Sequence, residues 1–208
     1  MINHTGTFKS SKAPFFWLCV CLAATVLALA ACGGGRNGDD TKTQAKPDQT
    51  PTTGGDGATT LSVHSDAFAP DQPIPSRFTC DGEDISPGLY WSNLPKGTFF
   101  SSLIMEDLDA PNGFAHWVVY NINTAGLPEA VPEGLVLATG GVQGINDFGR
   151  LAYNGPCPPK GSRHRFSFTV YALNGLIYPP ESASRQDVVG AMKGHILGQA
   201  QLIGNYER

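Results

Sequence analysis

The stretch "HRFSFTVYAL", His164 to Leu173, alternates apolar and polar side chains and decides the fold class. On an extended chain one face carries Phe166, Phe168 and Val170, and the other carries Ser167, Thr169 and Tyr171. A period of two is typical of a β-strand whose two faces lie in different surroundings. We therefore predict a strand over these ten residues.

Two further runs have strand character: "FFSSLIMED", Phe99 to Asp107, and "AHWVVYNI", Ala115 to Ile122. The second run is apolar on both faces, which is typical of a central strand. The segments between the runs are rich in Pro, Gly, Asn and Asp, which favour turns and loops. This spacing predicts a mainly β domain, either a sandwich or an open mixed sheet, rather than repeated βαβ units.

One helix is predicted near the C-terminus. Ser184 and Asp187 have the spacing of a capping box, and Val188, Met192 and Ile196 follow at intervals of four. Glycines at 190, 194 and 198 each weaken a helix interior by about 1 kcal/mol relative to alanine. We therefore expect this helix to be short or broken.

The N-terminus has the pattern of a secretory signal peptide. Lys9 and Lys12 precede an apolar run from Phe15 to Ala31, and "LAAC", ending at Cys32, resembles a bacterial lipobox. We predict a lipoprotein signal peptide over 1–31 and a lipidated Cys32 at the mature N-terminus. The alternative is an uncleaved transmembrane anchor, because about 17 apolar residues reach the lower limit of a bilayer span.

In both cases the rest of the chain lies outside the cytoplasm. We expect a lipid-anchored protein of the cell envelope that faces the periplasm or the exterior. Gly33 directly after the cysteine, in place of aspartate, is compatible with the outer membrane of a Gram-negative bacterium.

Residues 32–59 have the composition of a flexible polar linker, without an aromatic side chain. Such a linker has an r.m.s. reach of about 30 Å. The remaining residues, 60–208, are long enough for one domain and contain nine Lys/Arg and 14 Asp/Glu, a formal charge of −5. This acidic balance argues against nucleic acid as a partner, because nucleic-acid-binding domains carry a basic surface.

Three segments carry polar side chains suited to one shared site. Asp107 ends a strand in "EDLDAPNG", His116 begins the apolar strand, and "GPCPPKGSRHRF", Gly155 to Phe166, combines stiffening prolines with cations and His164. Histidines and backbone N–H groups donate to anions, and we interpret the cations of this stretch as complements of an anion. For Arg165 an internal ion pair, with Asp147, is the favoured alternative.

The segments "DLDAP", "AHWVVYNI", "GINDFGRLAYNGPCPPKGSRHRFSFTVYAL" and "GHILGQAQLIGNYER" occur in this order from 107 to 208. Together they resemble the signature segments of the phosphatidylethanolamine-binding protein family, specifically its bacterial Raf-kinase-inhibitor-like branch. The resemblance covers the chain from about residue 61 to its end. It implies an antiparallel β-sandwich-like domain with short C-terminal helical elements.

The resemblance also implies a small pocket for phosphate, phosphorylated head groups or similar anions. Carried over position by position, the ligand-binding residues are Asp107, His116, Gly155, Pro158, Pro159 and His164. Family members often have a cis peptide in the aspartate-to-proline turn. We nevertheless predict a trans bond before Pro111, because only about 5–6% of such bonds are cis. Phe166 stands where many relatives carry tyrosine, and the loss of the tyrosine hydroxyl removes one contact to a head group.

Several alternatives remain open. His116 and Asp107 could be structural, as a satisfied strand-end histidine and a turn cap. A metal site is disfavoured by the basic neighbours, and we expect no cofactor. Cys80 and Cys157 could form a disulfide in an oxidising compartment, although cytoplasmic relatives tend to carry both cysteines without needing a bridge.

The leading hypothesis is a membrane-tethered, non-catalytic binding module for a small anionic ligand. One alternative is an inhibitor or scaffold with a protein partner, as for eukaryotic relatives that bind kinases and proteases. The less favoured alternative is a hydrolase that uses Asp107 and His116, because no nucleophile elbow accompanies that pair.

Overall fold

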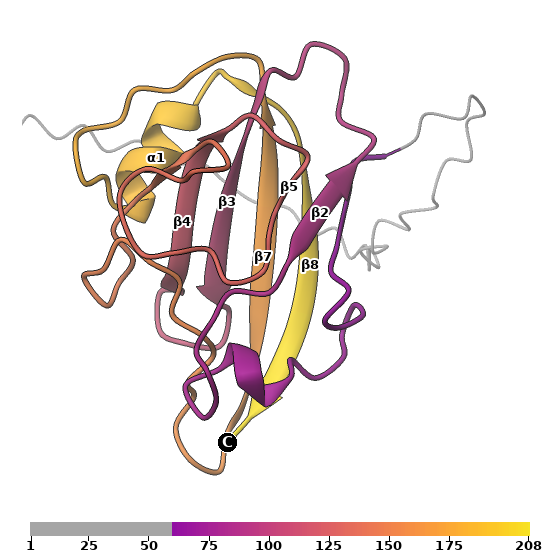
Figure 1. The fold of residues 1–208 in the computed structure, drawn as a ribbon, viewed down its shortest axis with the longest axis vertical. Helices are drawn as coiled ribbons and strands as arrows, with labels where there is room; N and C mark the ends of the chain where they lie inside the picture. The colour runs from indigo at the N-terminus through magenta and orange to yellow at the C-terminus, as the bar shows by residue number, and fades with distance from the viewer. Residues whose placement is uncertain (1–59) are drawn as a thin grey trace, which may run out of the picture. The chain divides into compact units, whose positions relative to one another are not determined.

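A five-stranded antiparallel sheet organises the described part of this computed structural model, residues 60–208 (Figure 1). The signal peptide and linker predicted for 1–59 lie outside the described residues. The three predicted strands are confirmed as the three inner strands of the sheet. In spatial order the strands are β6 (Val142–Gln143), β4 (Phe114–Ile122), β3 (Phe100–Asp107), β7 (Arg163–Leu173) and β8 (Ile196–Glu207).

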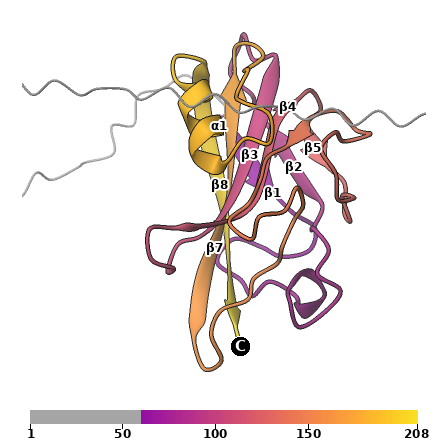
Figure 2. The ribbon, with the colours of Figure 1, turned by 90° about the vertical axis from the view of Figure 1, so that its left-hand side faces the viewer.

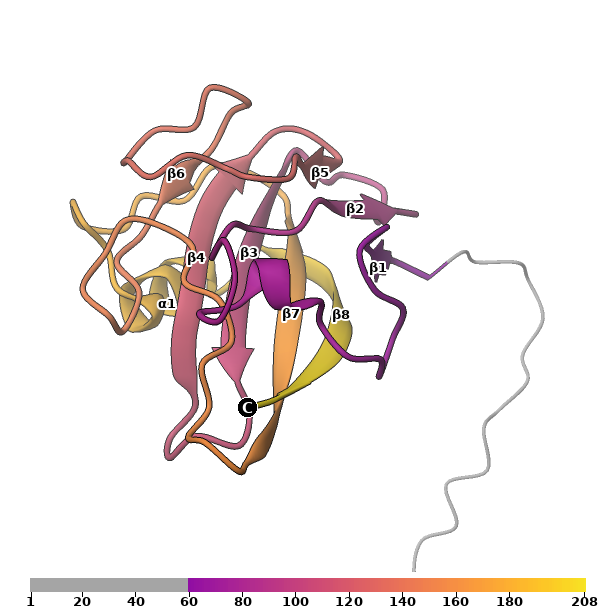
Figure 3. The same ribbon diagram turned by 60° about the horizontal axis from the view of Figure 1, so that its bottom comes forward.

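A second, smaller sheet packs on one face of the first (Figure 3). It consists of β1 (Ser62–His64), β2 (Leu89–Ser92) and β5 (Gly126–Leu127), and a single 3-10 turn, Ser76–Phe78, precedes β2. Side chains from both sheets meet in the main core, among them Trp91, Trp117 and Phe168, each at most 2% exposed. The expected antiparallel, sandwich-like arrangement is therefore confirmed.

The opposite face of the large sheet is covered by helix α1 (Arg185–Met192), as Figure 2 shows. The predicted capping box is present, because the Ser184 side chain accepts from the Asp187 N–H and the Asp187 carboxylate accepts from the Ser184 N–H. Val188 and Met192 are fully buried against the sheet. Within residues 60–208 no helix has the length and apolarity needed to cross a membrane.

These two layers explain the pattern of the strand that decides the fold. Phe166, Phe168 and Val170 of β7 point into the main core, whereas Ser167 and Thr169 point to the opposite face. Both faces are buried, so the two surroundings are two packed layers rather than core and solvent. The prediction that β4 is a central strand is also confirmed, since β4 lies between β6 and β3.

The C-terminal segment differs from the expectation. Ile196 belongs to β8 and not to the helix, because the helix ends at Met192 and Gly194 turns the chain with φ 81°. The last strand then pairs with β7 over its whole length. Short helical structure is therefore limited to α1 in this part of the described chain, and the terminal residues complete the sheet.

Candidate anion-binding site

Three segments that are distant in the sequence meet at one end of the large sheet. Asp107 is the last residue of β3, His116 lies near the start of β4, and His164 is the second residue of β7. Since β3 is antiparallel to both neighbours, its end lies beside their beginnings, and Asp107 pairs with Phe114 and Phe166. The structure therefore brings the three polar residues together as predicted.

A β-bulge determines where His116 points. In the register of β3 with β4, Met105 pairs with Trp117 and Glu106 pairs with Ala115, so His116 is an extra residue without an opposite partner. A bulge of this kind re-aims a side chain that would otherwise alternate to the other face. Here it turns His116 toward the Phe166 ring, 5.3 Å away between ring centroids, and so toward the face that also carries Asp107.

The His116 ring is buried and fixed by backbone carbonyls. Its Nδ1 lies 2.8 Å from the Asn154 carbonyl oxygen and 3.1 Å from that of Gly155. A carbonyl only accepts, so Nδ1 carries the hydrogen and Nε2 presents a lone pair in the neutral ring. Burial lowers the pKa of His116, although the two carbonyls and Asp107 act in the opposite direction. Within residues 60–208 no hydrogen bond engages Nε2 of this ring.

Asp107 caps a turn, as in the structural alternative, and also orients His164. Its Oδ1 accepts from the N–H groups of Asp109 and Ala110, at 2.9 and 3.1 Å, and so caps the turn. Its Oδ2 accepts from Nδ1 of His164 at 2.7 Å. A carboxylate on Nδ1 fixes the ring orientation and leaves Nε2 of His164 as the free nitrogen. The peptide bond before Pro111 is trans, as predicted.

Aromatic rings surround the His116 imidazole. Phe114, Phe148 and Phe166 all meet it edge to face, with ring centroids 5.2 to 5.5 Å away. Phe166 is fully buried, whereas Phe148 is 46% exposed and forms part of the rim. Apolar walls reduce solvent access and strengthen the hydrogen bonds that a ligand can make inside them.

The loop "GPCPP" contacts His116 through the Gly155 carbonyl oxygen. Gly155 donates its N–H to Asp84 Oδ1 at 2.6 Å, and a Cβ on this residue would lie 2.2 Å from the Phe78 carbonyl oxygen. Only glycine fits so close to another backbone. Gly155 therefore acts on the site through its carbonyl oxygen, which accepts from His116.

Pro158 and Pro159, the two prolines of this loop that were predicted to bind the ligand, differ in their surroundings. Pro158 is buried, whereas Pro159 is exposed and its carbonyl accepts from the N–H and the hydroxyl of Ser162. Cys157, between these prolines and Gly155, is joined to Cys80 by a disulfide. The loop is thus tied to residues 78–84 as well as to His116.

Arg163 and Arg165, two of the three cations in the stretch Gly155 to Phe166, do not converge on His116 and His164; for Arg165 this agrees with the favoured alternative of an internal ion pair. Arg163 and Arg165 flank His164 on β7 and so point to the opposite face. Arg165 forms an ion pair with Asp109, at 2.7 Å, which holds the pKa of Asp109 at about 2. The expected partner, Asp147, instead accepts from the Ala115 N–H. Arg163 donates to the Asn205 side-chain oxygen.

Asn146 is a component of the site that sequence reasoning missed. Its side-chain amide donates to the carbonyls of His116 and Ala152 and to the Asn154 side chain. Its side-chain oxygen accepts from the N–H groups of Phe148 and Arg150. Asn146 is only 2% exposed. It therefore joins three parts of the site: β4, the loop that carries Phe148, and residues 152–154, which precede the Gly155 carbonyl behind His116. Its position in the Gly-flanked "GINDFG" loop was the one available signal.

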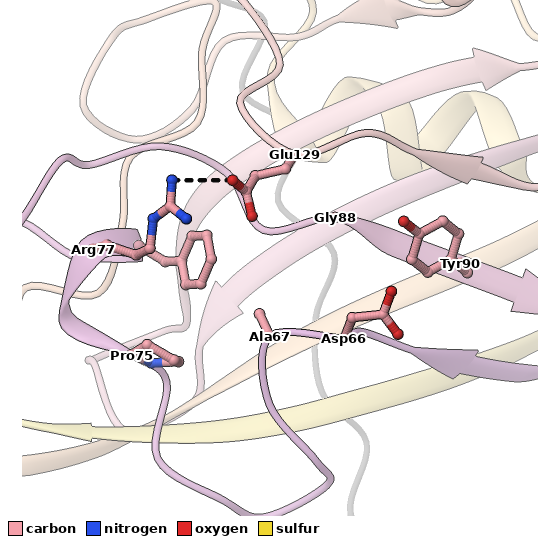
Figure 4. A pocket seen from close by; sticks show the side chains of 8 residues that line it. Asp66, Ala67, Pro75, Arg77, Gly88, Tyr90 and Glu129 are labelled. Atoms are coloured by element: carbon pink, nitrogen blue, oxygen red, sulfur yellow. Dashed lines mark ion pairs between the residues drawn. The ribbon is translucent and has the colours of Figure 1, made fainter.

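A separate cleft of about 340 Å³ is lined by residues of the 3-10 turn, by Tyr90 of β2 and by Glu129, and includes neither His116 nor His164 (Figure 4). Arg77 and Glu129 face each other across it at 3.0 Å, and Arg77 also pairs with Glu83. Its cation is thus already neutralised, so this cleft offers no free positive charge to an anion. Among residues 60–208 no three His, Cys, Asp or Glu side chains gather in a metal-binding arrangement.

Sequence relatives share most of this domain. Relatives named UPF0098 protein are 47% identical over 151 residues in Methanothermobacter thermautotrophicus and 49% identical over 158 residues in Aquifex aeolicus. The matches cover 71% and 73% of this chain, and 99% and 91% of the two relatives. The domain therefore corresponds to nearly the whole of these proteins.

Solved structures agree with this relationship. A putative phosphatidylethanolamine-binding protein homologue from Chlamydia trachomatis superposes with a TM-score of 0.65 at 34% identity, covering 72% of this chain and 98% of that one. E. coli YbcL, described as a member of the mammalian family, gives a TM-score of 0.67 at 32% identity over 72% and 99%. The sequence pattern of phosphatidylethanolamine-binding proteins matches residues 64–207. The chain thus belongs to the phosphatidylethanolamine-binding protein family.

Proposed function

We propose that this chain is a membrane-tethered, non-catalytic binding module that holds a small anion, phosphate or a phosphorylated head group, between His116 and His164. One observation carries the proposal. Each imidazole is fixed through Nδ1, by carbonyls in His116 and by Asp107 in His164, so that both Nε2 atoms are left for a ligand.

The chemistry of the two rings suits a phosphate that keeps one proton. Neutral His116 accepts from a P–OH group through Nε2, and it donates to a P–O⁻ group once it is protonated. His164, whose Nδ1 is held by the Asp107 carboxylate, presents its Nε2 from β7, on the other side of β3. Phe114 and Phe148 place apolar rings beside these contacts.

The absence of an activated nucleophile supports a binding role over hydrolysis. A covalent mechanism places a hydroxyl or thiol within hydrogen-bond reach of a base. Within residues 60–208, neither His116 nor His164 is hydrogen-bonded to a serine, threonine or cysteine side chain. Cys157, the thiol-bearing residue of the stretch Gly155 to Phe166, is engaged in the disulfide with Cys80.

The membrane tether is proposed from the sequence alone. A lipidated Cys32 would anchor the chain in the cell envelope, facing the periplasm or the exterior, and in an outer membrane if the bacterium is Gram-negative. The polar segment 32–59 would then connect the anchor to the domain, with a reach of about 30 Å.

Calorimetric titration with inorganic phosphate and phosphoethanolamine tests the anion site. Residues 60–208 are suitable for it, because the same domain makes up nearly the whole of the solved relatives. We expect saturable binding that weakens about tenfold or more in His116→Ala and in His164→Ala, because each loses a hydrogen bond to a charged group. His195→Ala, which removes a half-buried imidazole bonded to Asn174 and far from the site, is the matched control and should bind normally.

The affinity measured in this titration should depend on pH through the protonation of the histidines. Protonation converts Nε2 from an acceptor into a donor, so the affinity for phosphate should rise as the pH falls. Because burial lowers the pKa of His116, the gain due to this ring should appear below pH 6.5, the ordinary histidine value. A flat affinity between pH 8 and 5 would contradict a role for protonated histidine, and no binding at millimolar ligand would favour the protein-scaffold alternative.

A further inference from the structure

The end of the domain opposite the histidines exposes apolar side chains. We refer to residues 93–99, 174–178 and 193–199 as the apolar end. Phe99 and Tyr178 are 70% and 85% exposed, and the other exposed apolar side chains of this end are Leu94, Leu176, Ile196 and Leu197. Figure 1 shows the β2–β3 connection and the start of β8 together at the top of the view, with the C-terminus at the bottom.

Direct contacts join the three segments into one surface. The Asn174 N–H donates to the His195 carbonyl at 3.0 Å, and the Phe99 N–H donates to the Leu173 carbonyl at 2.9 Å. The backbone at Gly198 also packs on Pro95, because a Cβ there would lie 3.0 Å from the proline ring. The exposed side chains therefore belong to one continuous end and are not scattered single residues.

The charge of the apolar end is opposite to that of the domain. Residues 60–208 contain 14 Asp and Glu, but none of them lies in the three segments, which carry Lys96, Lys193 and His195. Apolar side chains beside lysines, without carboxylates, match the interface of an anionic bilayer, where lysines meet the lipid phosphates. A domain with a formal charge of −5 would otherwise be repelled by that surface.

The chain enters the domain at this same end. Asn93 donates from its side chain to the carbonyl of Thr60, the first described residue, at 3.4 Å, and Ser62 pairs with Ser92. In the proposed lipoprotein, residues 32–59 connect the lipidated Cys32 to Thr60, so the chain from the anchor joins the domain at the apolar end. An anchor close to the apolar end raises the effective concentration of this end at the bilayer surface. The apolar end therefore needs little intrinsic affinity for the bilayer to contact it.

We propose that the apolar end docks on the surface of the bilayer in which the chain is anchored; this inference rests on the proposed tether. β7 runs from His164, at the anion site, to Leu173, at the apolar end, and spans about 30 Å at 3.3 Å per residue. Docking therefore directs the histidines away from the bilayer. The ligand of the site is then a phosphorylated molecule from the aqueous phase and not a head group of the same membrane.

Paramagnetic relaxation enhancement in nanodiscs tests this orientation. The full chain, purified with its native modification, is placed in nanodiscs of phosphatidylcholine and anionic phosphatidylglycerol that contain a gadolinium-chelating lipid. We expect strong broadening of amide signals in 93–99 and 195–198 and little in 107–116 and 155–164. Phe99→Asp with Lys96→Glu should reduce the broadening about fivefold or more, since each lysine near the surface contributes about that factor in affinity.

Val136→Asp is the matched control, because Val136 is 73% exposed but lies outside the apolar end. It should leave the broadening unchanged. Flotation of the samples first shows whether the chain is bound to lipid. If the chain floats with the lipid but the broadening is uniform, or stronger at the histidines, docking is contradicted and the tether is not. A chain that does not float with lipid would overturn the tether and docking together. A phosphate titration of the same samples reports on the anion site independently of both.

Discussion

Replacing Cys80 and Cys157 with serine should lower the free energy of unfolding by about 4–5 kcal/mol. The two cysteines are 77 residues apart, and cross-linking a loop of this length removes about that much chain entropy from the unfolded state. Urea unfolding of residues 60–208 measures the difference between the oxidised protein and the double variant. Reduction of the wild-type protein should have a similar effect, and reductant should not change the double variant.

The same substitution should weaken phosphate binding. The disulfide holds the loop whose Asn154 and Gly155 carbonyls fix the His116 ring, and Gly155 also bonds to Asp84 on the partner segment. Two titratable thiols in unreduced wild-type protein would contradict the bridge. A loss of less than about 1 kcal/mol in the double variant would show that the hydrogen bonds between the segments suffice without it.

Asn146→Ala should lower the free energy of unfolding by about 3–5 kcal/mol and weaken phosphate binding. The substitution removes five hydrogen bonds and leaves buried carbonyls of His116 and Ala152 without this donor, at a cost of about 1–3 kcal/mol for each unsatisfied group. It also releases the Phe148 N–H, and with it the ring that packs on His116.

Urea unfolding and calorimetric titration of the variant give both effects. The exposed Asn123→Ala is the control and should change the stability by less than about 0.5 kcal/mol. Unchanged stability in Asn146→Ala would contradict the role of Asn146 as the residue that joins β4 to the loop behind His116. Reduced stability with unchanged phosphate affinity would limit that role to folding.

The sequence predicted the central strands because their pattern depends only on neighbouring residues. The alternation of Phe166, Phe168 and Val170 and the two apolar faces of β4 are readable within ten residues. The last strand was missed because Gly198, Gly204 and several amides give it weak strand character. β8 forms because its backbone pairs with β7 along its length. Gly204 also leaves room for Ile74 and Phe68, whose side chains would lie 2.6–2.7 Å from a Cβ at this position.

The candidate site was predicted in part. The resemblance to the family identified Asp107, His116 and His164, which the structure places at one end of the sheet. The bulge that aims His116 depends on the register of two strands and is invisible in either strand alone. The favoured internal ion pair of Arg165 is present, although its partner is Asp109 and not Asp147. The alternation that orders Phe166 and Phe168 also turns Arg163 and Arg165 away from the face that carries His164.

The most direct test of the anion site is a long-range ¹H–¹⁵N NMR spectrum of the histidine side chains during titration with inorganic phosphate. We predict saturable shifts of Nε2 in His116 and His164 with one common dissociation constant, with much smaller shifts of Nδ1 because the protein already holds it. His64, stacked on Tyr90, and His195, bonded to Asn174, serve as internal controls. Unshifted Nε2 atoms in both site histidines, or equal shifts in all four rings, would contradict the account.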